Sequence, residues 1–152
     1  MQAKSLARSS GELLTAVETI ENEMKQMPQV EMRLEHHFAK GLYARELHIP
    51  AGTLLTGKIH KYEQINILSK GQIRVLTQNG IVEVSAPFIV VSPPGTKRIA
   101  LAITDCVWIT VLPTDEKDPQ AIEDQFTCAT VDEYNEFCKQ IEHKECPSLP
   151  QQ

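Results

Sequence analysis

The region from about residue 30 to residue 112 constrains the fold most, because it breaks into short runs rich in Ile, Val, Leu and Thr. Gly, Pro and Asn separate these runs, as is typical of strands joined by turns. The segment Gln78-Asn79-Gly80 indicates a hairpin, since Asn and Gly tolerate a positive φ. We predict strands at 41–49, 54–60, 64–68, 71–77, 81–84, 88–91, 97–102 and 106–112. Eight short strands at this spacing favour a closed barrel or a jelly roll.

An amphipathic helix is predicted before the barrel, over residues 9–27. Ser9 and Glu12 have the spacing of a capping box, and Pro28 supplies a stop. Its apolar stripe is expected to pack against the barrel or a partner subunit. The stripe consists of Leu13, Leu14, Val17, Ile20, Met24 and Met27.

Two further helices are predicted after the barrel. Asp118 followed by Pro119 begins one that continues to about Gln125, and Thr130 with Glu133 caps another. The chain of 152 residues then reads as one structural domain with an N-terminal helical extension (1–29), a barrel (30–113) and a C-terminal helical tail (114–152).

Net charge and hydropathy argue against two classes of binding partner, nucleic acid and membrane. A net charge of −5 argues against a protein that binds the nucleic-acid backbone, which normally presents a basic face. No run reaches the roughly 18 apolar residues of a membrane span, and the N-terminus lacks the apolar core of a secretory signal. We therefore expect a cytoplasmic protein that binds neither nucleic acid nor membrane.

The cysteines suit a reducing compartment. Cys106, Cys128, Cys138 and Cys146 form no CxxC pair, so free thiols are expected. The last three and His143 offer zinc ligands as an alternative, but their spacing matches no standard finger.

Two segments of the predicted barrel resemble the conserved motifs of cupins. Residues 50–53 (PAGT), 57–60 (GKIH) and 64–71 (QINILSKG) are similar to the first motif. Residues 86–88 (APF) and 92–98 (SPPGTKR) are similar to the second, so the resemblance covers about residues 40 to 112. It extends in particular to small cupin-like proteins of bacteriophages. It implies a mainly β, double-stranded β-helix or jelly-roll barrel with an N-terminal helix and short C-terminal helices.

The resemblance also implies where a metal would bind. Cupins place two histidines, a glutamate and a later histidine inward, and these positions fall on Lys58, His60, Gln64 and Arg98. Only His60 is a usual ligand, and Lys and Arg offer only positive donors. We therefore expect no cofactor, with a divalent metal centred on His60 as the alternative.

The same positions suit an anion. If the cupin register holds, Lys58, His60, Gln64 and Arg98 face the barrel interior, where they would bind phosphate or carboxylate. Lys97 is expected to contribute beside Arg98. As the alternative, Lys58 or Arg98 lies at the barrel mouth, solvated or paired with Glu63 or Asp105.

Tyr43 and Arg45 share one face of the entering strand, since they are two residues apart. They are expected to add an aromatic ring and a further cation to the pocket, or else to form an ordinary surface pair. Trp108 is expected in the core or at a subunit contact, with stacking against a ligand as the alternative. Adjacent His36 and His37 should point in opposite directions, which argues against joint metal binding.

These residues favour a non-catalytic protein that holds a small anionic molecule. If the phage resemblance applies, the ligand is nucleotide-like, and the protein sequesters a defence signal in the host cytoplasm. A metal-dependent or metal-free cupin enzyme centred on His60, such as an oxygenase or isomerase, is one alternative. A structural phage protein is another. Small barrels have edges that invite pairing, so a homodimer or higher homo-oligomer is expected.

Overall fold

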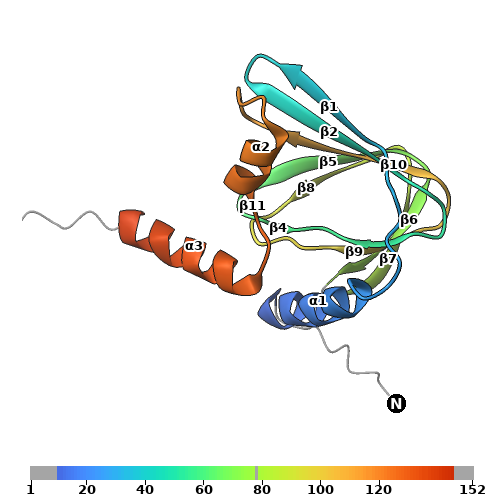
Figure 1. The fold of residues 1–152 in the computed structure, drawn as a ribbon, viewed down its shortest axis with the longest axis horizontal. Coiled ribbons are helices and arrows are strands. Elements are labelled where there is room, and N and C mark those ends of the chain that lie inside the picture. The colour runs from blue at the N-terminus through green and yellow to red at the C-terminus, as the bar shows by residue number, and fades with distance from the viewer. Residues whose placement is uncertain (1–9, 78, 146–152) are drawn as a thin grey trace, which may run out of the picture.

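The computed structural model describes residues 10–77 and 79–145, and it is mainly β (Figure 1). The strands within these residues are β1 (Leu34–Ala39), β2 (Leu42–Ile49), β3 (Leu54–Thr56), β4 (Ile59–His60), β5 (Gln64–Lys70), β6 (Gln72–Thr77), β7 (Gly80–Ser85), β8 (Phe88–Ser92), β9 (Ile99–Ala102), β10 (Cys106–Leu112) and β11 (Thr127–Cys128). The helices are α1 (Ser10–Met24), α2 (Pro119–Phe126) and α3 (Val131–Glu145).

The strands form two facing antiparallel sheets. One has the order β1-β2-β10-β5-β8 and the other β3-β9-β6-β7, while β11 pairs with β4 at one end of the barrel. The chain passes from one large sheet to the other between β2 and β3, β5 and β6, β7 and β8, β8 and β9, and β9 and β10. This alternation confirms the predicted jelly-roll barrel.

Alternation along the strands separates an inner from an outer face. The core lies between the sheets and is formed by Ile49, Leu68, Ile73, Val75, Ala100, Ala102 and Cys106, with Trp108 packed against it. The expected core position of Trp108 is therefore confirmed. The predicted hairpin is also present, because β6 and β7 pair in antiparallel register from Gln72 opposite Ser85 to Thr77 opposite Gly80.

The sequence prediction missed β1 and joined β3 to β4. Residues Leu34–Ala39 contain no β-branched side chain, so their strand conformation depends on pairing with β2 through the turn at Gly41, where φ is +74°. The predicted strand 54–60 divides at Gly57 and Lys58, where the chain leaves β9 to pair with β11. The predicted strand 97–102 begins only at Ile99.

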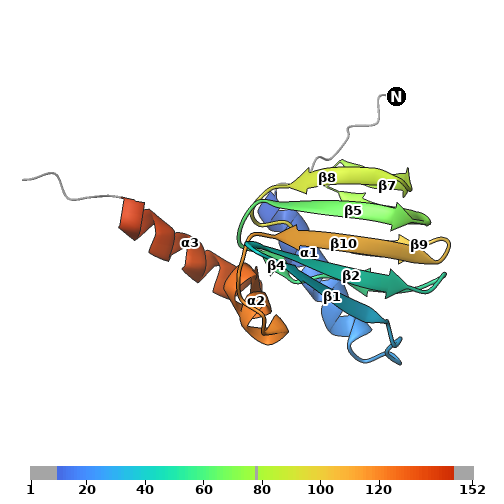
Figure 2. The same ribbon diagram turned by 90° about the horizontal axis from the view of Figure 1, so that it is seen from above.

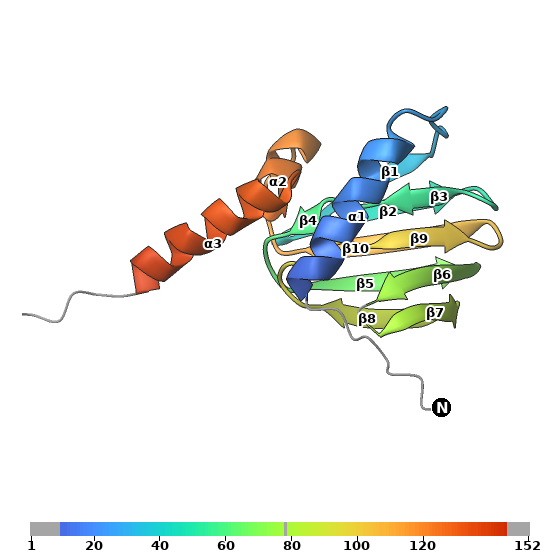
Figure 3. The same ribbon diagram turned by 90° about the horizontal axis from the view of Figure 1, so that it is seen from below.

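Helix α1 lies against the side of the barrel formed by the four-stranded sheet (Figures 1 and 3). It ends at Met24, earlier than predicted, and the Gln29 amide donates hydrogen bonds to the carbonyls of Met24 and Met27. Val17, a residue of this helix, is fully buried, whereas Met27 lies beyond the end of the helix and is exposed. The predicted cap at Ser9 lies outside the described residues.

Helix α2 closes one end of the barrel. Asp118 caps it by accepting from the Gln120 backbone N–H at 3.3 Å, and Ile122 and Phe126 are buried with Tyr43 and Leu112. Helix α3 begins directly after the predicted cap at Thr130 and projects away from the barrel (Figure 1), so the predicted short C-terminal helices are present. None of the helices described is both long and apolar enough to cross a membrane.

Candidate anion-binding cavity

A cavity of about 490 Å³ lies between the two sheets and extends to α2. Most of its wall is apolar, and the apolar lining includes Met32, Leu34, Leu47, Ile49, Leu55, Ile73, Val75, Ala100 and Trp108. The polar lining includes His36, Tyr43, Arg45, Lys58, His60, Asn66, Arg98 and Thr110. A cavity of this size and character is typical of small-molecule sites.

Two guanidinium groups line this cavity. Arg45 comes from β2 and Arg98 from the segment before β9. Burial lowers the pKa of Arg98 below its ordinary value, yet an arginine stays protonated. Within residues 10–77 and 79–145, neither group forms an ion pair with a carboxylate. The cavity therefore holds two cations without an ion-pair partner among the described residues, and Glu123, the acidic residue of the lining, is paired with Lys58.

A chain of hydrogen bonds fixes the orientation of Arg98. Its Nη2 donates to the Ser92 hydroxyl at 2.7 Å, and the Asn66 amide donates to the same oxygen at 2.7 Å. The Thr110 hydroxyl donates to the Asn66 carbonyl oxygen at 2.8 Å. The guanidinium also lies 5.7 Å from the centre of the Trp108 ring, within cation–π range. Ser92, Asn66 and Thr110 are buried, so this network sets a defined direction for the charge.

His60 is a neutral imidazole in the cavity wall. Burial and then the positive charges of Arg98 and Arg45 lower its pKa to about 4. Its Nδ1 is buried and has no hydrogen-bond partner among the described residues. His60 can therefore offer a ligand one polar atom without adding a third charge at neutral pH.

Tyr43 and His36 lie side by side on the inner face of β2 and β1. The Tyr43 hydroxyl is 2.7 Å from His36 Nδ1, and the two rings stack with centroids 5.8 Å apart. Burial raises the pKa of Tyr43, so the hydroxyl keeps its proton. His37 points to the outer face, where its Nε2 lies 3.8 Å from Glu46.

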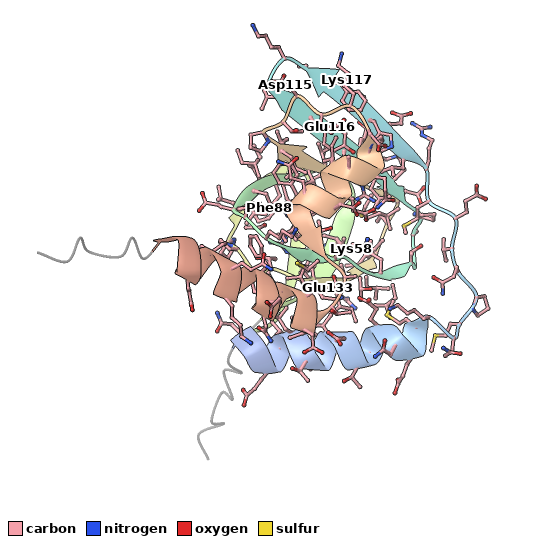
Figure 4. The ribbon with its side chains drawn as sticks, turned by 60° about the vertical axis from the view of Figure 1, so that its left-hand side comes forward. Lys58, Phe88, Asp115, Glu116, Lys117 and Glu133 are labelled. Atoms are coloured by element: carbon pink, nitrogen blue, oxygen red, sulfur yellow. The ribbon has the colours of Figure 1, made fainter. Side chains whose placement is uncertain are left out.

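Lys58 lies at the mouth of the cavity, beside α2 (Figure 4). Its Nζ is 3.1 Å from Glu123, and both side chains are substantially exposed. The alternative of a paired lysine at the barrel mouth describes this arrangement, although the partner is Glu123 rather than Glu63 or Asp105. A carboxylate already neutralises this cation, which separates it from Arg45 and Arg98.

Gln64 and Lys97 do not line the cavity, which differs from the expectation for both. Lys97 points to the other side of the chain from Arg98, and its Nζ lies 2.5 Å from Oε2 of Glu21 on α1. Gln64 is buried opposite Ser92, and its amide nitrogen has no partner among the described residues. The sequence prediction missed Asn66, Ser92 and Thr110. Asn66 follows Gln64 by two residues, so the alternation itself would have indicated it.

The residues at the cupin metal positions do not fit a divalent cation. Lys58 and Arg98 supply cationic donors in place of ligands, and the charges of Arg98 and Arg45, after burial, contribute to the lowered pKa of His60. A different group with metal-ligand chemistry lies on the outer face of β1 and β2, formed by Glu35, Glu46 and His48. Arg33 already contacts it, 3.0 Å from Glu35 and 3.3 Å from His48.

The cysteines described are free thiols. Burial raises the pKa of Cys106 and of Cys128. Cys138 is half-buried on α3. Cys146, which the zinc alternative requires, lies outside the described residues, as does the side chain of His143.

A scan against protein-family models finds no match, and a search of curated proteins finds no relative. Among solved structures the chain is similar to KdgF from Halomonas sp., with a TM-score of 0.49 and 18% identity over 61% of this chain and 88% of that one. It is also similar to a cupin-2 domain protein from Shewanella frigidimarina, with a TM-score of 0.44 and 11% identity over 62% of this chain and 92% of that one. A cupin domain from Bordetella pertussis is similar too, with a TM-score of 0.45 and 14% identity over 58% of this chain and 98% of that one. The chain is thus similar to solved cupin-domain proteins in its fold.

Proposed function

We propose that the protein binds a small molecule with an anionic group and an apolar body inside the barrel, and that it does so without chemical change. The observation that carries this proposal is the pair Arg45 and Arg98. Both guanidinium groups line the cavity, and neither has an acidic partner within the part of the chain described. Both side chains are partly buried, and a partly desolvated cation without an acidic partner favours a counter-charge, so an anion that enters the cavity gains from both groups.

The rest of the lining selects the body of the ligand. Leu47, Leu55, Ile73 and Trp108 present apolar surface on the same cavity that holds the two cations. A ligand with a carboxylate or phosphate at one end and an aliphatic or aromatic body matches this division. Inorganic phosphate or acetate would leave the apolar wall unoccupied and is expected to bind more weakly.

Calorimetric titration of the full chain tests this proposal. Matched pairs isolate the charge: octanoate against octanamide, benzoate against benzamide, and adenosine monophosphate against adenosine. We expect the anion of at least one pair to bind and its neutral analogue to bind much more weakly. Equal affinities within every pair would contradict the proposal.

Substitutions identify the residues. Arg98→Met and Arg45→Met are each expected to weaken binding of the anion by about 2 to 5 kcal/mol, the usual cost of losing one partner of a desolvated charge pair. Arg74→Met is the matched control, because Arg74 is exposed on the outer face of β6 and pairs with Glu83. Unchanged affinity in both cavity variants would place the ligand elsewhere.

The comparison of adenosine monophosphate with adenosine tests the predicted nucleotide-like ligand. A role against host defence would follow only if adenosine monophosphate binds. The enzyme alternative requires turnover at His60, so it predicts that a bound ligand is consumed when the mixture is followed by mass spectrometry. The structural alternative predicts no ligand. We propose the binding protein because the two unpartnered cations favour a bound anion directly, whereas neither alternative requires them.

A further inference from the structure

Metal-ligating side chains gather on the outer face of β1 and β2, away from the cavity. Glu35 lies directly opposite Glu46 in the antiparallel register, and His48 follows Glu46 by two residues on β2. An oxygen of each carboxylate and a ring nitrogen of His48 all lie within 4.8 Å of one another. The alternate residues of β2, Arg45 and Leu47, line the cavity, so this group points to the opposite side of the sheet.

A fourth metal-ligating side chain lies beside these three. His37 is two residues from Glu35 on β1, and its Nε2 lies 3.8 Å from Oε1 of Glu46. Nε2 of His48 lies 2.8 Å from the other oxygen of the same carboxylate. Two imidazoles and two carboxylates thus meet around Glu46, and both kinds of group are zinc ligands in proteins.

The charges on this face favour a cation. Glu35 and Glu46 are like charges on opposite residues of paired strands, which is a destabilising arrangement. Arg33 already supplies positive charge here, because its Nη2 is 3.0 Å from Oε1 of Glu35 and 3.3 Å from Nε2 of His48. A cationic side chain therefore touches two of the three residues that offer ligand atoms.

Nε2 of His48 cannot satisfy both of its neighbours. If Nε2 carries no proton, it accepts from Arg33 but meets an oxygen of Glu46 at 2.8 Å with lone pairs on both atoms. If Nε2 is protonated, it donates to Glu46, but its contact with the guanidinium then joins two donors. A metal ion removes this conflict, because the imidazole and both carboxylates present lone pairs to it.

We propose that this group binds Zn²⁺, with Glu35, Glu46 and His48 as ligands. His37 completes the tetrahedron, and Arg33 moves into solvent. The side chain of Arg33 is 65% exposed, so it can leave without disturbing the core. Bonds of about 2.0 to 2.1 Å place tetrahedral ligand atoms about 3.3 Å apart. Rotation of side chains at the surface brings the ligand atoms to that spacing.

Bound zinc joins β1 to β2 by a second link besides the backbone hydrogen bonds. All four ligands lie on these two strands, and Figure 2 shows β1 at the edge of the five-stranded sheet, next to β2. Leu34 and His36 line the cavity from the other face of β1. The metal therefore stabilises part of the cavity wall from outside, whether or not the cavity is occupied.

Calorimetric titration of the full chain with zinc chloride tests the proposal. We expect one equivalent to bind with a dissociation constant on the order of micromolar. Mg²⁺ and Ca²⁺, which prefer sites made of oxygen ligands alone, should bind at least about tenfold more weakly. Hydrogen exchange of the β1 amides should become slower when zinc is bound, since the metal opposes opening of this edge.

Substitutions distinguish a metal site from a network of ion pairs. His48→Gln and Glu46→Gln should each weaken zinc binding by at least about tenfold, and Glu35→Gln provides the same test if Glu46→Gln does not fold. Arg33→Met should strengthen zinc binding, because a competing cation is removed, whereas an ion-pair network only loses a member. Glu63→Gln is the matched control, since Glu63 is exposed and lies outside the group.

Two further variants test for zinc bound elsewhere. His60→Gln removes an imidazole of the cavity wall, and Cys138→Ser removes a half-buried thiol of α3. Both should bind zinc as the unmodified chain does. The proposal is overturned if the unmodified chain binds no zinc, if His48→Gln binds it at full affinity, or if either of these two variants loses the binding.

Discussion

The ammonium of Lys97 is buried against the carboxylate of Glu21, with Nζ 2.5 Å from Oε2, and this ion pair joins the segment before β9 to α1. The side chain of Lys97 is 1% exposed and that of Glu21 is 15% exposed. The helix is thus attached to the barrel by a desolvated charge pair in addition to the burial of Val17.

Glu21→Gln is expected to lower the free energy of unfolding by about 3 to 5 kcal/mol, because it leaves Lys97 buried without a counter-charge. Urea denaturation followed by far-ultraviolet circular dichroism measures the change. Glu23→Gln on the exposed side of the same helix is the control and should change stability by less than about 0.5 kcal/mol. Equal effects of the two substitutions would rule out a structural role for the pair.

The contribution of Glu21 should disappear in acid. Burial alone would raise its pKa, but hydrogen bonds from Lys97 and Thr56 and the charge of Lys97 bring the pKa below its ordinary value of 4.5. A carboxyl group with a lowered native pKa stabilises the fold above pH 4.5, and this stabilisation is lost as the pH falls through the native pKa. The stability difference between Glu21→Gln and the unmodified chain should therefore shrink below pH 4.5.

His60 should make stability depend on pH in a higher range. Its native pKa of about 4 lies below the ordinary 6.5, so between these values the unfolded chain binds more protons. Stability is expected to fall as the pH drops from about 6.5 to 4, by up to about 3 kcal/mol. His60→Gln should flatten this part of the profile. A bound anion should raise the His60 pKa, which an NMR titration of the imidazole would detect.

Arg45→Met should leave the free protein as stable as before, or more stable by up to about 1 kcal/mol. Arg45 has no ion-pair partner among the described residues, so the substitution removes an unpaired charge from an apolar wall. Thermal unfolding without ligand measures this effect, and the titration proposed above measures the loss of affinity. A destabilisation of 2 kcal/mol or more would show that Arg45 supports the barrel itself.

Three glycine-to-alanine substitutions should differ in the stability they cost, according to the φ of each glycine and the room for an added Cβ. At Gly71 φ is +90° and an added Cβ would clash with the backbone oxygen of Asp105, so a loss of about 3 kcal/mol or more is expected. Gly41 has a φ of +74° but open space, which predicts a loss near 1 kcal/mol. Gly57 has neither feature and should change stability little. Chemical denaturation of the three variants gives the order directly.

Short runs of apolar and β-branched residues, separated by turn residues, made most of the barrel predictable from the sequence. The predicted strand 106–112 matches β10 in both bounds, because Cys106–Leu112 is apolar except for Thr110 and rich in β-branched residues. β1 could not be predicted in this way, since Leu34–Ala39 has no such run and takes its conformation from β2. A strand that is stabilised only by pairing with its neighbour leaves no recognisable pattern in its own sequence.

The cavity was predictable where a residue's face followed from spacing. Tyr43 and Arg45 share the inner face of β2, and both line the cavity. Lys97 could not be assigned in the same way, because its partner Glu21 lies on α1 and is distant in sequence. The ion pair between Lys58 and Glu123 depends likewise on where α2 packs against the barrel. The sequence around Lys58 does not indicate that position.

The hydrogen bonds that orient Arg98 have a consequence for the order of folding events. Asn66 and Ser92 are 26 residues apart, and Asn66 and Thr110 are 44 residues apart. Contacts between residues so far apart in sequence form only after long loops have closed. In a partly folded chain the guanidinium of Arg98 is therefore not yet oriented for a ligand. A molecule bound in the cavity should therefore slow unfolding of the barrel while leaving the folding rate nearly unchanged.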